Sequence, residues 1–212
     1  MNVKGQKMKK WLLMALLLAS GLANAASELG KDYVLMGKPQ PVANPKKVEV
    51  IEFFSYTCIH CFHLDPLITA WAKKKPAYVD FRREQIVWQK PMEGFARLFA
   101  TLNVTGYMEK LNAPVFDAVM QQKINLADPA VLNDWLKKQP GVNLAKFMQT
   151  YNSFGINSQV ARASQITRAY NIEGTPTIVV NGKYALSPAA PERLIEVLND
   201  VIAKAKAESN IK

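Results

Sequence analysis

"KVEVIEFFSYTCIHC", residues 47–61, runs from a strand into a pair of cysteines. Residues 47–54 are a compact run of β-branched and aromatic side chains, which predicts a buried strand. From Cys58 the apolar residues recur at helical spacing, with a kink expected at Pro66. Residues 78–87 alternate apolar and polar side chains, which indicates a second strand. Strand, helix and strand in this order predict a parallel βαβ unit.

The remainder of the chain divides into a helical stretch and a second strand-containing unit. From residue 91 to 171 helix-period segments follow one another without a strand signal, and Asp128 before a proline predicts a helix N-cap. Residues 175–180, "TPTIVV", predict a strand, and the "NG" at 181–182 predicts a hairpin turn. A last helix is expected from about 191 to 206. The predicted order is βαβ, helical block, ββα.

The first 25 residues have the three parts of a secretory signal. Lysines precede an apolar centre, and "ANA" at 23–25 is a small-x-small cleavage site. The rival interpretation is a membrane anchor, but the apolar stretch is shorter than the roughly 20 residues that span a bilayer. We therefore predict cleavage between Ala25 and Ala26 and a soluble, exported mature protein.

The charge of the chain is only mildly basic once the signal is removed. The whole chain has 27 basic and 17 acidic residues, for a net charge of +10. The signal holds four lysines and no acids, so 23 basic and 17 acidic residues remain, a formal charge of +6. The basic runs at 73–75 and 82–83 lie in different predicted elements without interleaved aromatic residues. We predict a solvated basic surface and no nucleic-acid site.

Both cysteines and both histidines of the chain fall within six residues: Cys58, His60, Cys61 and His63. Two thiolates and two imidazoles are a familiar zinc set, but such sites usually take their second ligand pair from a distant segment. We therefore expect no metal, and for His63 a solvated or capping role. A disulfide between residues 58 and 61 also closes too short a loop to restrain the unfolded chain. The spacing therefore favours redox chemistry over a zinc site and over a structural disulfide.

The position of the cysteines at a predicted helix start assigns them different roles. Residues three apart in a helix share a face, so the two sulfurs lie within bonding reach. Cys58 is next to unpaired N–H groups and the positive end of the helix dipole, which favour a thiolate, so it is the expected nucleophile. Cys61 is one turn deeper and is the expected resolving thiol. The imidazole of His60 would stabilise the thiolate further. A stabilised thiolate makes the disulfide easy to reduce and therefore oxidising.

Three segments together resemble the DsbA family of periplasmic thiol-disulfide oxidoreductases. They are "EFFSYTCIHC" at 52–61, the helical block, and "GTPTIVVNGKY" at 174–184. The resemblance covers the chain from about residue 30 and implies an α/β thioredoxin fold, βαβ…ββα, interrupted by a helical insertion domain. The expected division is a signal at 1–25, the first part of the thioredoxin fold at 26–90, the helical insertion at 91–171 and the second part at 172–212.

The resemblance also implies roles for the residues around the cysteines. Cys58 matches the attacking cysteine of the family and Cys61 the resolving one. His60 stands where the family commonly has histidine. Ile59 departs from the proline often found before that histidine, which bears on how far the pKa of the attacking thiol is lowered.

Two further positions come from the same resemblance. Thr175-Pro176 matches the cis-proline loop of the family, which faces the active site and binds substrate. Glu52 matches a buried acid under the active site, for which the resemblance implies a proton-relay role. From the residues alone this support is weak, since Glu49 lies in the same strand and a charge in a strand usually marks a solvated end.

The leading hypothesis is an oxidase that passes its Cys58-Cys61 disulfide to newly exported cysteine-containing proteins through a mixed disulfide on Cys58. It needs no cofactor beyond that disulfide, is expected to be a monomer, and would be reoxidised by a quinone-linked, DsbB-like membrane partner. One alternative is a reductase or isomerase, but known isomerases of the superfamily carry a separate dimerisation domain before the thioredoxin fold. A second alternative is a peptide-binding chaperone whose cysteines are incidental.

Overall fold

The structure is a computed structural model that describes residues 26–211. The predicted signal peptide lies outside these residues. The strands of the described part form a five-stranded sheet in the order β1-β5-β4-β2-β3. They are β1 Tyr33–Leu35, β2 Val48–Phe54, β3 Val79–Gln85, β4 Thr177–Val180 and β5 Tyr184–Leu186.

Strand β2 is the central strand that carries the site, and its seven residues are all buried. It pairs in parallel with β3, with Glu52 opposite Arg83, and antiparallel with β4. The predicted hairpin joins β4 to β5, and its Asn181 and Gly182 both have positive φ, 54° and 61°. A Cβ at Gly182 would lie 2.1 Å from the backbone oxygen of Gln40, so this turn requires glycine.

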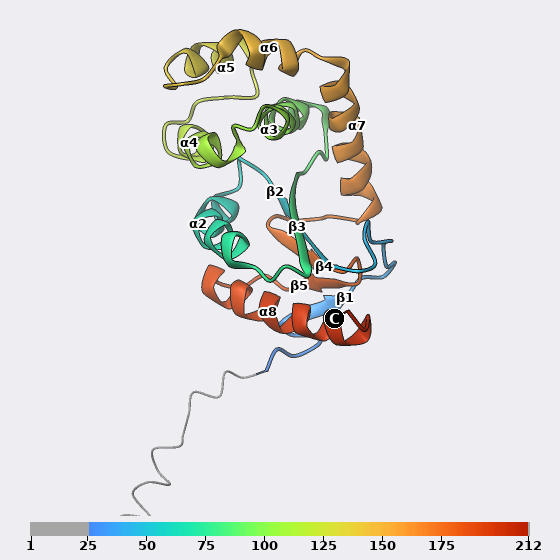
Figure 1. Cartoon of the computed structure of the whole chain (residues 1–212). Helices are drawn as coiled ribbons and strands as arrows, with labels where there is room; N and C mark the ends of the chain where they lie inside the picture. The colour runs from blue at the N-terminus through green and yellow to red at the C-terminus, as the bar shows by residue number, and fades with distance from the viewer. Residues whose placement is uncertain (1–25, 212) are drawn as a thin grey trace, which may run out of the picture.

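Alternate residues of β2 supply two cores, one on each face of the sheet. Val48 and Val50 pack with α2, Ile59–Lys74, and α8, Pro191–Glu208, while Ile51 and Phe53 pack on the opposite face. Figure 1 shows α2 and α8 together on one side of the sheet and α7 on the other. Because its side chains alternate between the two faces, β2 contributes to both cores and joins the βαβ and ββα units in one layered fold.

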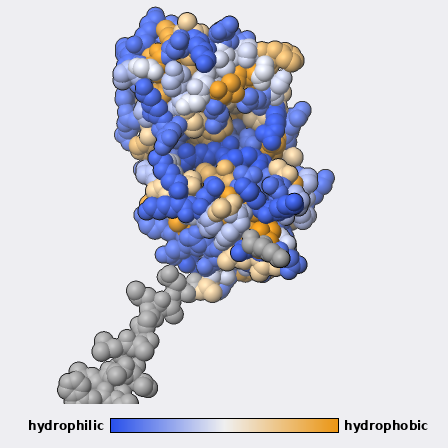
Figure 2. Space-filling view, in the orientation of Figure 1, coloured by the Kyte–Doolittle hydropathy of each residue, from blue (hydrophilic) through white to orange (hydrophobic). Residues whose placement is uncertain are grey.

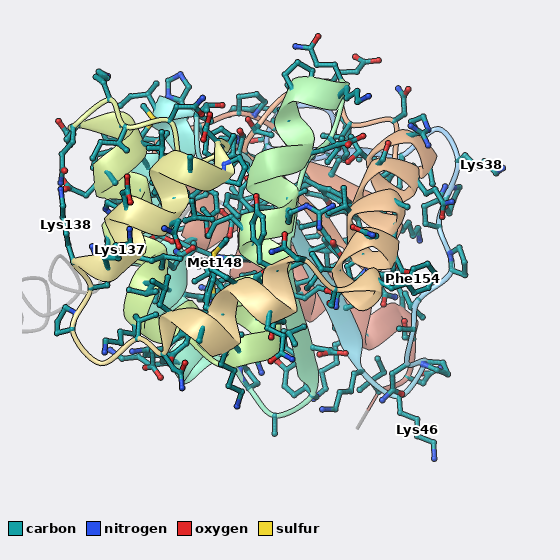
Figure 3. The ribbon with its side chains drawn as sticks, turned by 90° about the horizontal axis from the view of Figure 1, so that it is seen from above. Lys38, Lys46, Lys137, Lys138, Met148 and Phe154 are labelled. Carbon is teal, nitrogen blue, oxygen red and sulfur yellow. The ribbon has the colours of Figure 1, made fainter. Side chains whose placement is uncertain are left out.

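The helical block follows β3 and covers the end of the sheet where β2 leads into the cysteines (Figure 1). After a short 3-10 helix, Lys90–Met92, it consists of α3 Glu93–Thr105, α4 Met108–Met120, α5 Pro129–Lys137, α6 Leu144–Tyr151 and α7 Phe154–Ala169. The predicted N-cap is confirmed, since Asp128 Oδ1 accepts hydrogen bonds from the N–H groups of Ala130 and Val131. Seen from above, α3 and α7 lie side by side, and Phe154 marks the corner between α6 and α7 (Figure 3).

The block has its own core, which reaches the active-site helix. Buried aromatic and aliphatic side chains of α3, α4, α5 and α6 form one cluster with Phe54, Tyr56 and Cys61. The thioredoxin fold interrupted by a helical insertion is therefore confirmed. Among the helices within residues 26–211, none has the length and apolar character needed to cross a bilayer.

One strand was missed and two expectations from the sequence were wrong. Strand β1 was not predicted, because its three residues become a strand only through pairing with β5. The arginines at 82–83 are not a solvated basic surface: the Arg83 side chain is only 12% exposed and pairs with buried acids. Glu49 is likewise buried rather than at a solvated end, and Arg82 pairs with it. Charges inside a sheet require such partners because unpaired burial is costly.

Candidate active site

Cys58 is the N-cap of α2 and lies directly after the buried strand β2. Its backbone is extended, with φ −97° and ψ 117°, and its Sγ accepts a hydrogen bond from the N–H of Cys61 at 3.3 Å. The side chain is half-buried. The sulfur therefore occupies the position that a serine or aspartate oxygen takes in an ordinary helix cap, among the unpaired N–H groups of the first turn.

These contacts lower the pKa of Cys58 from 9.0 to about 5. The largest cause is the hydrogen bond that the Cys61 thiol donates to it. Hydrogen bonds from the Thr175 side chain and from the backbone N–H groups of Cys61 and His60 act in the same direction, while burial opposes them. Cys58 is thus mostly a thiolate at neutral pH.

Cys61 has the opposite character. It is fully buried in the core shared with the helical block. The hydrogen bond to Cys58 and the burial both raise the pKa of the Cys61 thiol far above its ordinary value. Both residues are free thiols in the structure. The pair therefore combines an accessible thiolate with a buried thiol.

The loop before β4, the strand that pairs with β2, contacts the sulfur. The Thr175-Pro176 peptide bond is cis, as the family resemblance implied. The backbone oxygen of Thr175 lies 3.2 Å from Cys58 Sγ, although 117 positions separate the two residues. The predicted substrate loop and the predicted nucleophile are therefore in direct contact.

A hollow of about 480 Å³ lies beside this contact. It is lined by both histidines of the chain, by the cis-proline loop and by the segment that leads into α8: His60, His63, Thr175, Pro176, Pro188 and Leu194. Both histidines are exposed, and Ile59 is 42% exposed. The expected solvated character of His63 is confirmed. His60 acts on Cys58 through its backbone N–H, and its imidazole faces the hollow.

Glu52 is buried in β2, at 2% exposure, and is held by one arginine. Arg83 Nε, in the neighbouring strand, donates to Glu52 Oε2 at 2.7 Å. Burial raises the pKa of the Glu52 carboxyl, Arg83 opposes this, and the charges of Asp65 and Cys58 raise it further. Glu52 is thus electrostatically linked to the nucleophile.

Arg83 extends the buried network toward the helical block. Its Nη2 lies 3.0 Å from Asp65 Oδ1 in α2, and the same oxygen accepts a hydrogen bond from Asn112 Nδ2 in α4 at 2.7 Å. Asn112 Oδ1 accepts in turn from the Tyr56 hydroxyl at 2.8 Å. The chain Glu52, Arg83, Asp65, Asn112 and Tyr56 runs under the cysteines and joins both parts of the fold.

Four members of this network were missed by reasoning from sequence. A signal for Arg83 was present, because the parallel register of the two predicted strands places it beside Glu52. Asp65 is one helical turn after Cys61, on the same side of α2. Nothing local identifies Asn112, whose partner Tyr56 lies 56 positions away.

No group of three or more histidine, cysteine, aspartate or glutamate side chains is arranged to hold a metal ion in the described part of the chain. The reactive groups gathered at the start of α2 are a thiolate, a buried thiol and a buried carboxyl. Their chemistry is thiol-disulfide exchange.

Comparison with known proteins identifies this arrangement. Residues 49–198 match the model of the DSBA-like thioredoxin domain. The chain is 41% identical to the thiol:disulfide interchange protein DsbA of Burkholderia cepacia, over 87% of this chain and 88% of the relative. It is 35% identical to that of Pseudomonas aeruginosa, over 94% and 98%.

Solved structures agree. DsbA of Pseudomonas aeruginosa superposes with a TM-score of 0.81 at 35% identity, covering 87% of this chain and 97% of that one. Reduced DsbA1 of Neisseria meningitidis gives 0.81 at 33% identity, covering 89% and 100%. With the fold, the cysteine pair and the cis-proline contact in agreement, the chain belongs to the DsbA-like thioredoxin family and is a protein thiol:disulfide oxidoreductase.

Proposed function

We propose that the chain is a periplasmic oxidase that donates its Cys58-Cys61 disulfide to newly exported proteins. The observation that carries this is the contrast within the pair, a Cys58 pKa of about 5 beside a strongly raised Cys61 pKa. A thiolate that is stable at neutral pH stabilises the reduced state and is a good leaving group. Both properties favour transfer of the disulfide away from this protein.

The exchange proceeds in two steps, and each step breaks one sulfur–sulfur bond as it forms another. A client thiolate attacks Cys58 Sγ of the disulfide, and the electron pair of the broken S–S bond leaves on Cys61. A second client thiolate then attacks the client sulfur of the mixed disulfide, and Cys58 leaves as a thiolate. The client loses two electrons and gains a disulfide, while the protein ends with both cysteines reduced.

Cys61 needs a proton in the first step, since its buried site disfavours the thiolate. We assign Glu52 as the proton donor. Burial raises the pKa of this carboxyl, which favours its protonated form, and an ionised Glu52 would raise the pKa of the Cys61 thiol. In this assignment Arg83 is a positioning residue that holds the carboxyl by the 2.7 Å hydrogen bond.

The docking surface is assigned to the cis-proline loop. The backbone of Thr175 beside Cys58 can pair with an extended client as an added strand. Pro176 has no N–H, so no donor at this position competes for the sulfur. The adjoining hollow at His60 would receive a client side chain.

The remaining parts of the proposal come from the sequence. Residues 1–25 act as a signal removed between Ala25 and Ala26, which delivers a monomer to the periplasm. Residues 26–90 and 172–212 form the thioredoxin part and 91–171 the helical insertion. A quinone-linked membrane partner returns the cysteines to the disulfide.

The test mixes the oxidised protein with a reduced, unfolded client that has two cysteines. We expect one client disulfide to form for each pair of thiols that appears at Cys58 and Cys61, measured by mass after thiol alkylation. With an already oxidised client, Cys61→Ser should stop at a mixed disulfide on Cys58, and Cys58→Ser should not react. A Cys58→Ser variant that still oxidises clients would refute the proposal.

A further inference from the structure

Trp88 joins the two connections between the sheet and the helical block. It lies three positions after β3, in the connection that leads into the block, and it is 48% exposed. Its Nε1 donates a hydrogen bond to the backbone oxygen of Ile172 at 2.6 Å, although 84 positions separate the two residues. Ile172 lies in the connection that returns from α7 to β4 (Figure 1). One side chain thus ties the way into the block to the way out of it.

Along one edge of the sheet a hollow separates these two parts of the fold. A groove of about 660 Å³ lies at the free edge of β3, the end strand, and helices α2, α3, α4 and α7 contribute to its walls. Figure 2 shows a hydrophilic hollow on the face drawn in Figure 1. The block and the sheet do not pack tightly along this edge, so contacts at the connections matter for how the two parts are held.

Ile172 is the fixed point from which the cis-proline loop begins. Its side chain is buried in the core on the α7 face of the sheet, and its N–H donates to the oxygen of Thr167 at 3.1 Å. The bond from Trp88 holds the remaining backbone group, the C=O. Because a peptide unit is planar, fixing this oxygen sets the plane of the peptide from which the loop leaves.

The loop between Ile172 and Thr175 is exposed. A Cβ added to Gly174 would meet no atom within 4 Å. Thr177 Oγ1 donates to the Gly174 oxygen at 2.8 Å, a bond within the loop itself. Thr175 then reaches the sulfur, with its backbone oxygen 3.2 Å from Cys58 Sγ. The orientation set at Ile172 is therefore carried over three residues to the contact with the nucleophile.

The contact between Thr175 and Cys58 depends on a well-defined distance. A hydrogen bond from the Thr175 side chain is among the causes that lower the pKa of Cys58. Hydrogen bonds weaken steeply when their geometry is lost, and a misplacement of about 1 Å can cost a catalysed reaction roughly a hundredfold. A residue that fixes the loop therefore affects both the ionisation of Cys58 and the docking of an extended client.

We propose that Trp88 is a positioning residue for disulfide exchange. Its indole N–H orients the Ile172 carbonyl and thereby holds the Thr175 backbone beside the nucleophile, where an extended client pairs with it. Trp88 acts through the loop and takes no part in the transfer of electrons. The assignment rests on the docking role of Thr175 proposed above. If Trp88 served only to fill space, its indole N–H would not matter for Cys58.

Two matched substitutions test this role. Trp88→Phe removes the indole N–H and keeps an aromatic ring. Trp71→Phe is the control, because Trp71 Nε1 donates a similar bond, 2.9 Å to Asn199 Oδ1, between α2 and α8. In the reduced protein the thiolate absorbance midpoint of Cys58, at a pKa of about 5, should rise by roughly 0.5 pH units in Trp88→Phe, since the hydrogen bond from Thr175 weakens. It should not move in Trp71→Phe.

Client oxidation is the second readout. For a reduced peptide with two cysteines, kcat/KM should fall roughly three- to tenfold in Trp88→Phe, mainly through KM. Free cysteine cannot pair as a strand, so its reaction should change by less than about twofold. Equal effects on the peptide and on free cysteine, an unmoved Cys58 midpoint, or equal effects in Trp71→Phe would each overturn the positioning role.

If Trp88→Phe does not fold, the chain with Trp88 intact supplies the test. In Cys61→Ser a client peptide is held on Cys58 as a mixed disulfide. The indole N–H signal of Trp88 in nuclear magnetic resonance should then shift, while that of Trp71 stays in place. An unmoved Trp88 signal would overturn the role. Failure of the wild type to oxidise clients would refute the proposed function alone, because the titration of the reduced protein still tests Trp88.

Discussion

At the scale of single residues, two sulfur atoms three positions apart occupy opposite environments. Cys58 accepts hydrogen bonds at the start of a helix, while Cys61 is fully buried and donates one. The stabilised thiolate of Cys58 and the burial of Cys61 could both be predicted from the sequence. The switch from a strand pattern to a helix pattern marks the helix start, and that start sets both environments. The contribution of Thr175 could not be derived locally, since it comes from a loop 117 positions away.

The first prediction concerns ionisation. Thiolate ultraviolet absorbance of the reduced protein should titrate with a midpoint near a pKa of about 5. The transition should be absent in Cys58→Ser. A midpoint near the ordinary value of about 8.5 would contradict the assignment of Cys58 as the stabilised thiolate.

The second prediction follows by linkage. The folded pKa of Cys58 is depressed, so its stabilisation of the reduced protein is fully present above the unfolded pKa and is lost as pH falls through about 5. Denaturant unfolding of the reduced protein should therefore show a stability advantage over Cys58→Ser near pH 9 that shrinks toward about pH 4. An advantage independent of pH would argue against this origin.

The third prediction concerns Arg83, which holds two buried carboxylates. Arg83→Met leaves Glu52 and Asp65 without their cation, so we expect a loss of about 3 to 5 kcal/mol in unfolding free energy at neutral pH. Arg168→Met, at an exposed position of α7, should cost no more than about 0.5 kcal/mol. Equal losses of unfolding free energy for the two substitutions would show that the buried ion pairs of Arg83 do not contribute to stability.

At the scale of elements, locally encoded features were predictable and those made by distant pairing were not. Strand β2, the helix start at Cys58 and the hairpin at Asn181 follow from short sequence patterns. Strand β1 has only three residues and depends on β5. Asn112 gave no signal either, because its role arises only when α4 packs beside α2.

The fourth prediction tests that link between α4 and α2. Asn112→Ala removes the acceptor of the Tyr56 hydroxyl and one donor to Asp65, which leaves buried polar groups unpaired. Unfolding free energy should fall by about 1 to 3 kcal/mol, measured by denaturant titration. Asn103→Ala, at an exposed position of α3, is the matched control. A loss no larger than that of the control would mean that the network does not join the two parts.

At the scale of the whole molecule, the sheet, α2 and the helical block meet at the cysteines. Cys61 packs in the core of the helical block, Cys58 contacts the cis-proline loop, and Glu52 lies in the central strand. The sequence indicated this arrangement through three separated segments, because each carries a local pattern. It did not indicate the groove at the free edge of β3, which exists only where helices from both faces surround one strand.

The central claim is that the cysteine pair is oxidising, and its equilibrium with a glutathione buffer tests this most directly. At pH 7 a Cys58 pKa of about 5 favours the reduced thiolate roughly a hundredfold over an ordinary thiol, which corresponds to roughly 60 mV toward oxidising character. We therefore predict that Cys58 and Cys61 remain reduced in buffers that already oxidise thioredoxin, whose potential is about −270 mV. The fraction reduced is read by alkylation and mass. A titration midpoint at or below that of thioredoxin would contradict the account.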